Sequence, residues 1–279
     1  MNQNIVITGA TSGIGEVAAL RLAADGARII FIARSPDRAN ALMVRLQAAN
    51  SAVQHAAHIA DLSSIAEMKR VALDIAAAEP VIDMLINNAG AVFMGDVITV
   101  DGLSPTFAVN HLAYHVLTLM LLPSLRRADG ARIICTASRA HRYATMDFDN
   151  LQRNGVLGYA QSKLENLLFV RRLSQLLKGE RITVNAFHPG FVATRFADNT
   201  GLMWRTLTKM RKRLFGLSPQ QGAQTLLYLA QSSEVNAISG GYYVRCQRQL
   251  PSIHAQHDAN AQRLWKLTVD CTGVDFPER

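Results

Sequence analysis

The chain is poor in cysteine and has neither a long apolar run nor a dense block of basic residues. Its three cysteines, Cys135, Cys246 and Cys271, are scattered among 279 residues and odd in number. This usage excludes a disulfide framework and a cysteine-rich zinc site, and it indicates reduced thiols. No stretch approaches the roughly 18 uninterrupted apolar residues of a membrane-spanning helix.

The beginning of the chain leaves little room for a targeting segment. The first strand pattern starts by Asn4, so we expect neither a signal peptide nor an N-terminal membrane anchor. Together with the reduced thiols, this predicts a soluble, cytoplasmic protein.

The net charge of +8 raises the question of nucleic-acid binding. The Lys and Arg residues do not form the runs of a nucleic-acid-binding tail, and no binding module is recognisable. We therefore expect no nucleic-acid partner. The length fits one large domain or two small ones.

A glycine-rich turn follows the first apolar strand. Residues 4–8 resemble a short buried strand, and Gly9, Gly13 and Gly15 then precede a helix pattern over residues 16–25. Glycines permit close backbone approach, and a helix start offers free N–H groups and a positive dipole end to a pyrophosphate. The G-x-x-x-G-x-G spacing in this context predicts nucleotide binding.

The second strand, residues 27–33, ends in Ala33-Arg34-Ser35 without an acid. An acidic residue at this place typically holds the ribose 2′-hydroxyl of NAD, whereas a guanidinium suits a 2′-phosphate. With Arg38 one turn further on, the sequence predicts NADP(H) over NAD(H). The alternative is that Arg34 is a solvated loop residue.

Strand and helix patterns alternate through the rest of the chain. Further strands are expected to end near 59–61 and to cover 81–90, 131–136, 182–187 and 240–244, with helices at 63–78, 103–122 and 157–177. Repeated β-α units predict an α/β fold, a Rossmann-type doubly wound parallel sheet of seven strands flanked by helices. Ligands then bind at the carboxyl ends of the strands.

Tyr159 and Lys163 are four residues apart, which places both side chains on one face of the helix expected at 157–177. A cation roughly 4–6 Å away favours a phenolate and lowers the pKa of a tyrosine from about 10. This spacing is common by chance in surface helices. Combined with a nucleotide-binding turn, it predicts a general acid–base pair.

Taken together, these motifs resemble the short-chain dehydrogenase/reductase family. The matching segments stand in family order and span most of the chain: 8–15, Asp61-Leu62, 87–90, Asn110, Ser138, Tyr159-x-x-x-Lys163 and Pro189-Gly190. The 21-residue interval from Ser138 to Tyr159 exceeds the family's usual dozen. It is similar to the retinol dehydrogenase branch, as are residues 110–112, 183–190, 222–225 and the tail 239–273.

The resemblance implies hydride transfer between a nicotinamide and a small hydrophobic carbonyl or alcohol. Tyr159 would donate or accept the proton, and Lys163 would lower the tyrosine pKa and hold the nicotinamide ribose. Ser138 would hydrogen-bond the substrate oxygen. Asn110 would support a water chain that feeds Lys163.

The resemblance also assigns cofactor contacts along the chain. They comprise Gly9, Ser12, Gly13, Ile14 and Gly15 at the pyrophosphate, Asp61 and Leu62 at the adenine, Asn88, Ala89 and Gly90 at the ribose, and Pro189, Gly190, Val192 and Thr194 at the carboxamide. Arg34 and Arg38 would bind the 2′-phosphate, and Tyr159 and Lys163 would contact the nicotinamide end of the cofactor. Dimers or tetramers through the two long helices, 103–122 and 157–177, are a further family expectation.

Residues 191–217 match the family's variable substrate lid within a single domain, 1–279, that ends in an extension, 245–279. Apolar residues recur at helical spacing over 203–214, with Arg and Lys around them, as in an interfacial amphipathic helix. One hypothesis is that this basic helix touches an anionic membrane. The alternative is that its apolar stripe packs on the protein's own core.

Several other residues have simpler explanations. His111 and His115 have a spacing that can bind a metal, but no third ligand is evident, so we expect structural roles and no metal site. His141 and His188 lie beside site motifs and are candidates for substrate contact. Cys135 lies in an apolar strand and is expected to be a buried thiol.

The leading interpretation is an NADP(H)-dependent oxidoreductase. The alternative is an NADP(H)-binding regulatory protein with little or no catalysis. Such a protein would be expected to lack Tyr159 or Lys163, and both are present.

The cofactor preference can be tested at Arg34. We expect a lower Michaelis constant for NADPH than for NADH, and Arg34→Ala should raise the NADPH value by about 10-fold, because a charged hydrogen bond contributes about 1.5–3 kcal/mol. Steady-state kinetics with both cofactors measure this. A preference for NADH that Arg34→Ala leaves unchanged would refute the assignment.

Overall fold

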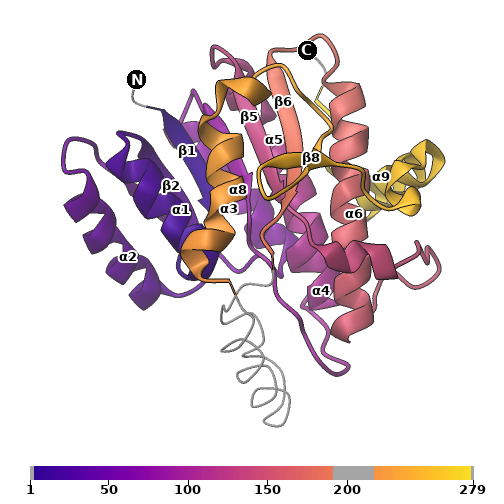
Figure 1. Cartoon of the computed structure of the whole chain (residues 1–279). Coiled ribbons are helices and arrows are strands. Elements are labelled where there is room, and N and C mark those ends of the chain that lie inside the picture. Colours follow the sequence, from indigo (N-terminus) through magenta and orange to yellow (C-terminus); the bar gives the residue numbers. More distant parts are fainter. Residues whose placement is uncertain (1–2, 191–216, 278–279) are drawn as a thin grey trace.

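The computed structural model describes residues 3–190 and 217–277. The lid prediction, including Val192, Thr194 and the basic helix at 203–214, lies outside the described residues apart from Leu217. A single sheet has the order β3-β2-β1-β4-β5-β6-β7-β8, with helices on both of its faces (Figure 1). The strands are β1 Asn4–Thr8, β2 Arg28–Ala33, β3 Ala56–Ile59, β4 Met84–Asn87, β5 Ala131–Thr136, β6 Ile182–His188, β7 Tyr242–Val244 and β8 Gln247–Gln249.

The doubly wound parallel sheet is confirmed, but the prediction of seven strands was wrong by one. Strands β1 to β7 pair in parallel, and β8 adds an antiparallel edge to β7. Arg245 and Cys246 link these last two strands with φ angles of 52° and 62°, the left-handed geometry of a tight hairpin turn. β8 has three exposed polar residues, so it carries no apolar alternation that a sequence pattern could reveal.

The described helices run along both faces of the sheet and at its carboxyl edge. They are α1 Gly13–Ala24, α2 Pro36–Ala49, α3 Ile65–Ala78, α4 Pro105–Phe107, η1 Ala108–Leu112, α5 Ala113–Arg126, η2 Arg139–Tyr143, α6 Gly155–Leu176, α8 Pro219–Gln231, η4 Ser233–Val235, η5 Ile253–Gln256 and α9 Asp258–Thr272. The helix predicted at 103–122 is thus three consecutive pieces, of which η1 is a π-helical turn.

The strand side chains alternate between two hydrophobic cores, as the period of two in a strand requires. Ile5 and Ile7 of β1 face the core beneath α1, α2 and α8. Val6, between them, faces the opposite core, which α3, α5 and α6 cover. Because both faces of the central strands are buried, β1, β2 and β4 are mostly apolar along their length, which is typical of a parallel sheet.

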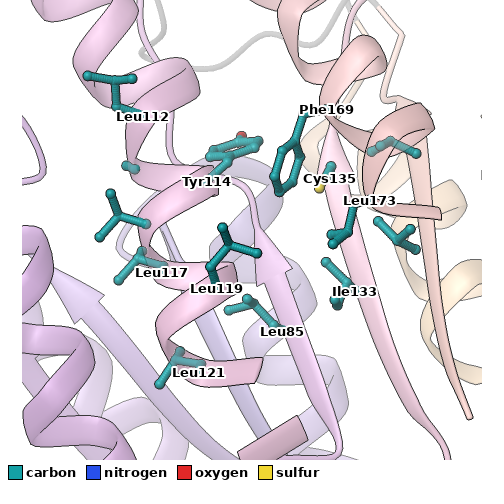
Figure 2. Packing of buried hydrophobic residues seen from close by; sticks show 14 of the residues in the cluster. Leu85, Leu112, Tyr114, Leu117, Leu119, Leu121, Ile133, Cys135, Phe169 and Leu173 are labelled. Atoms are coloured by element: carbon teal, nitrogen blue, oxygen red, sulfur yellow. The ribbon is translucent and has the colours of Figure 1, made fainter. Parts of the chain in front are cut away.

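The α5 side of the sheet packs closely (Figure 2). Leu119 of α5 lies near Leu85 of β4, while Phe169 of α6 lies beside Cys135 of β5. Within the described residues, the continuous helical stretch Pro105–Arg126 is the one long and apolar enough to cross a membrane, and 83% of its apolar 18-residue window is buried inside the protein. Its apolar character is therefore accounted for by the core.

The C-terminal extension docks on η1, α5 and α6 through buried aromatic and histidine contacts. His111 Nε2 lies 3.0 Å from the Thr268 hydroxyl, and His115 Nε2 lies 2.8 Å from the Val274 carbonyl oxygen. Trp265 of α9 stacks on Phe169 with 5.9 Å between ring centroids. The two histidines have the structural roles expected of them, since burial lowers their pKa values to about 3 and about 4.

Trp265→Ala tests how much this docking stabilises the fold. The indole is 9% exposed and donates a hydrogen bond of 3.2 Å to Asp275, so its removal should lower the unfolding free energy by about 3–5 kcal/mol. Urea denaturation measures the change. As a control, Leu73→Ala on α3, where Leu73 is 61% exposed, should cost no more than about 0.5 kcal/mol. Equal costs for the two variants would contradict the proposed docking.

Candidate functional site

The candidate site lies where the strand order reverses, between β1 and β4. Loops after these two strands diverge to opposite faces, which opens the crevice where doubly wound sheets bind ligands. Thr8, the last residue of β1, bridges the loops: its hydroxyl accepts hydrogen bonds of 2.9 Å from the backbone N–H groups of Asn88 and Ala89. This threonine joins the glycine turn to the end of β4.

The glycine turn needs glycine for two separate reasons. Gly9 and Gly13 have φ angles of +68° and +62°, which favour residues without a Cβ atom. A Cβ atom on Gly15 would lie 2.3 Å from the Gly9 carbonyl oxygen. The Asn88 amide donates to the carbonyl oxygens of Thr8 and Gly9 at 3.2 and 3.1 Å, so it supports the turn from beneath.

The start of α1 presents backbone N–H groups that no side chain caps. Ser12 occupies the N-cap position, and its hydroxyl makes no cap hydrogen bond. The N–H groups of the first helical turn, which includes Gly13, Ile14 and Gly15, have no partner further back within the helix. With the positive end of the helix dipole, they form an anion-binding site suited to a pyrophosphate.

The residues predicted for the adenosine end lie at the carboxyl ends of β2 and β3. Arg34 and Arg38 are exposed, and within the described part of the chain neither guanidinium forms an ion pair. Asp61 is exposed and accepts a hydrogen bond of 3.0 Å from the Ser63 backbone. Leu62, beside it, is buried. Guanidinium groups of this kind can form forked hydrogen bonds with phosphate oxygens.

Lys163 and Tyr159 project from α6 toward the end of β5. The Lys163 ammonium, 2% exposed, donates to the Thr136 carbonyl oxygen at 3.2 Å. It also lies 5.5 Å from the centre of the Tyr159 ring. Ser138, two residues beyond Thr136, places its hydroxyl within hydrogen-bonding reach of the Tyr159 phenol.

The direction of the Tyr159 pKa shift differs from the sequence expectation. We expected the lysine to lower this pKa, but burial raises it to about 12, against an opposing effect of the Ser138 side chain. Burial also lowers the pKa of Lys163 to about 8. Removal from water disfavours both charged forms, and the ammonium lies over the ring face, where it stabilises a phenolate oxygen little. Tyr159 is therefore a neutral phenol at physiological pH.

Asn110 lies in the π-helical turn η1, an irregularity often found at functional sites. Its side chain is fully buried. It accepts a hydrogen bond of 2.9 Å from the Ala91 backbone, and donates at 3.0 Å both to the Ala91 carbonyl and to the Ser162 hydroxyl. It thus connects the loop after β4 to α6, next to Lys163.

Gly90 lies between Asn110 and Lys163. A Cβ atom on Gly90 would lie 3.2 Å from both the Asn110 Oδ1 and the Lys163 Nζ. Its missing side chain therefore lets the loop after β4 approach these two polar groups closely.

Two histidines that were candidates for substrate contact hold the loop of Ser138. His141 is fully buried. Its Nδ1 donates to the Ser138 carbonyl at 2.5 Å, and its Nε2 accepts from the Ser252 backbone at 3.0 Å. His188 Nδ1 accepts from the Arg139 backbone at 3.3 Å. Both ring nitrogens of His141 are occupied by bonds within the protein, so His141 positions the loop of Ser138.

At the end of β6, Pro189 leads into Gly190, which has a φ angle of +88°. A Cβ atom there would lie 2.4 Å from the Leu217 side chain, so Leu217 packs directly against this turn. Cys135 is fully buried, as expected, and burial raises its pKa to about 12.

Sequence reasoning missed Tyr114 and Thr8. The Tyr114 hydroxyl donates to the Ala89 carbonyl at 2.9 Å, and its ring centre lies 5.8 Å from the Lys163 ammonium. The signal available for Tyr114 was its position four residues after Asn110, on the same helix face. For Thr8 it was the position immediately before the glycine turn.

The residues at this edge fit a nicotinamide dinucleotide. They combine an uncapped helix start for a pyrophosphate, cations beyond β2 and a buried lysine near a phenol. The described residues contain no group of three or more metal-binding side chains.

Comparison with known proteins gives an independent view. A family model described as short chain dehydrogenase matches residues 3–203. Retinol dehydrogenase 13 of Homo sapiens is 35% identical to the chain, covering 99% of it and 86% of the human protein. Retinol dehydrogenase 12 of Mus musculus is 33% identical, covering 98% and 87% of the two chains. An uncharacterised protein from Mycobacterium paratuberculosis has a similar crystal structure, with a TM-score of 0.80, 29% identity and coverage of 99% and 95%.

Glu165 offers a test of how strongly the interior of α6 is desolvated. Burial raises its pKa to about 8 from 4.5, so its carboxyl stays protonated in the folded chain between these pH values and ionises in the unfolded chain. Its contribution to stability is complete below pH 4.5 and is lost as the pH rises to about 8.

We therefore expect Glu165→Gln to gain in unfolding free energy over the parent as the pH rises from 4.5 to 8, by about 4 kcal/mol. Denaturant unfolding at several pH values measures it. The exposed Asp270→Asn should show no such trend. A constant difference between Glu165→Gln and the parent would mean that this carboxyl is ionised in the fold.

Proposed function

Because the chain belongs to the short-chain dehydrogenase/reductase family, in its retinol dehydrogenase-like branch, we propose that it is an NADP(H)-dependent oxidoreductase. Its substrate is a small hydrophobic aldehyde, ketone or alcohol. The observation that carries the proposal is the enclosed Lys163 ammonium beside the Tyr159 phenol, with Ser138 within reach. Burying a cation is unfavourable unless polar groups surround it. Such a group is retained where it takes part in binding or catalysis, which supports a site for cofactor and substrate here.

In the reductive direction, Tyr159 is the proton donor. Its raised pKa keeps the phenol protonated at neutral pH, which is the form that a general acid requires. Ser138 donates a hydrogen bond to the carbonyl oxygen of the substrate and stabilises the charge that develops there. The nicotinamide supplies the hydride when it is bound, and hydride and proton together convert the carbonyl into an alcohol.

Lys163, whose ammonium lies 5.5 Å from the centre of the Tyr159 ring, contacts the nicotinamide ribose in this proposal. Its pKa of about 8 lets it exchange a proton near neutrality, which suits a relay from solvent to Tyr159. Asn110, held by Ala91 and Ser162, positions the loop beside this relay and supports its water chain.

The cofactor is NADP(H) in this proposal. Gly9, Ser12, Gly13, Ile14 and Gly15 hold the pyrophosphate, and Arg34 and Arg38 hold the 2′-phosphate. Their support is the uncapped start of α1 and the two exposed guanidiniums without ion pairs among the described residues. The other contacts are Asp61 and Leu62 at the adenine, Asn88, Ala89 and Gly90 at the ribose, and Pro189, Gly190, Val192 and Thr194 at the carboxamide.

We further propose a single domain in a cytoplasmic protein, with residues 203–214 as the part that could meet an anionic membrane. For assembly, α9 already packs on α6 through Trp265 and Phe169, and Trp265 also contacts His115 of α5. A homodimer or homotetramer through the two long helices must therefore use surface that α9 leaves free.

Tyr159→Phe tests the proton donor. Its turnover of a carbonyl with NADPH should fall by about 10²–10⁴-fold, since it can no longer transfer a proton, whereas NADPH binding measured by fluorescence should persist. Tyr143→Phe is the matched control, because Tyr143 is 86% exposed on η2 and should keep its activity.

Substantial turnover in Tyr159→Phe would require another acid. NADPH binding by the parent without turnover of any carbonyl in a broad panel would favour the regulatory alternative.

A further inference from the structure

A cavity of about 200 Å³ opens between η2 and the β7–β8 hairpin. Arg139 and Arg142 of η2 line it from one side, and Tyr242 and Arg245 from the other. Val244, Gln247 and Gln249 complete the lining, so none of the lining residues in the described part of the chain is acidic. A whole drug-sized ligand needs a larger pocket, but the charged end of a molecule fits a cavity of this size.

The three arginines are uncompensated within the described residues. None of them forms an ion pair, and the hydrogen bond recorded for their guanidiniums runs from Arg142 to the Leu250 carbonyl at 2.6 Å. Guanidiniums that line one hollow repel one another and attract oxyanions, which they bind through forked, charge-assisted hydrogen bonds.

Tyr242 provides a second, independent observation. The residue is 3% exposed, and its buried hydroxyl has no hydrogen-bond partner among residues 3–190 and 217–277, although Tyr242 belongs to the cavity lining. A buried polar group without a partner costs stability, and buried tyrosine hydroxyls usually have one. The His141 ring packs edge-on against the Tyr242 ring with 5.2 Å between centroids, which holds the phenol in place.

The cavity lies next to the loop of Ser138. Ser138 is the N-cap of η2, and Arg139 is the following residue, about 3.8 Å away between Cα atoms. Val244 ends β7, which pairs in parallel with β6, so the cavity lies at the same carboxyl edge of the sheet as the nucleotide-binding turn. A substrate whose carbonyl is at Ser138 can extend toward the arginines.

We propose that this cavity binds an oxyanion, a carboxylate or phosphate group, and that it holds the anionic end of the substrate during hydride transfer. The substrate class is then a hydrophobic carbonyl or alcohol that carries an acid group at a distance from the reacting carbon. The substrate part of this inference rests on the function proposed above, whereas the oxyanion part does not.

The experiment compares an ω-oxo carboxylic acid with its methyl ester, which have the same chain and the same reacting aldehyde. NADPH oxidation gives kcat/KM for each, and we expect the acid to be favoured. In Arg245→Gln and in Arg142→Gln the ratio of acid to ester should fall by about 10-fold, the usual effect of losing one charge-assisted hydrogen bond. Tyr242→Phe should lower it by a smaller factor.

Arg248→Gln is the matched control. Arg248 lies on the same hairpin and carries the same charge, but it alternates with Gln247 and Gln249 along β8 and does not line the cavity. Its ratio should equal that of the parent. An equal fall in Arg248→Gln would assign the preference to general surface charge and overturn the site.

Calorimetry with inorganic phosphate, without cofactor, separates the sources of the oxyanion. Phosphate binding that weakens by about 10-fold or more in Arg245→Gln supports an oxyanion site. If such binding occurs but no carbonyl is turned over, the proposed function is refuted while the oxyanion site stands. Phosphate binding without any preference for the acid over the ester would overturn the substrate part. Absence of both effects would overturn the whole inference.

Discussion

The burial of one ammonium group organises the candidate site. Lys163 is enclosed between the rings of Tyr114 and Tyr159 and donates to the Thr136 carbonyl. A cation removed from water is unfavourable unless polar groups surround it, so the end of β5 and the loop after β4 must stay in place around it. Gly90 permits this enclosure, because a side chain there would press on both Lys163 and Asn110.

Polar links tie the three central strands together at the same edge. Thr8 of β1 receives the N–H groups of Asn88 and Ala89 beyond β4, and the Thr136 hydroxyl of β5 donates to the Asn88 side chain at 3.2 Å. One network thus fixes the glycine turn, the loop after β4 and the strand that leads to Ser138. The nucleotide end and the proton-transfer end of the site cannot shift independently of one another.

The C-terminal part of the chain also helps to hold the loop of Ser138. Ser252 donates to His141, which in turn donates to the Ser138 carbonyl. The hairpin of β7 and β8 brings Arg245 opposite Arg139 and Arg142 across one cavity. Segments far apart in the chain therefore shape both the loop of Ser138 and the cavity beside it.

The sequence alone determined the parallel α/β fold, the glycine turn and the family, because these depend on short-range spacing and on residue types with narrow conformational or chemical uses. The bounds expected for β5 match the structure, since an apolar run between turns defines a buried strand. The spacing of Tyr159 and Lys163 likewise placed them together on α6.

The tertiary structure decided what depends on distant neighbours. It added β8, whose polar residues form a strand only because β7 is there to pair with, and the π-helical turn that carries Asn110. It reversed the expected shift of the Tyr159 pKa, because desolvation is a property of the enclosed site and not of a spacing. It also assembled the arginine cavity from η2 and a hairpin that begins a hundred residues later in the chain, a proximity that only folding creates.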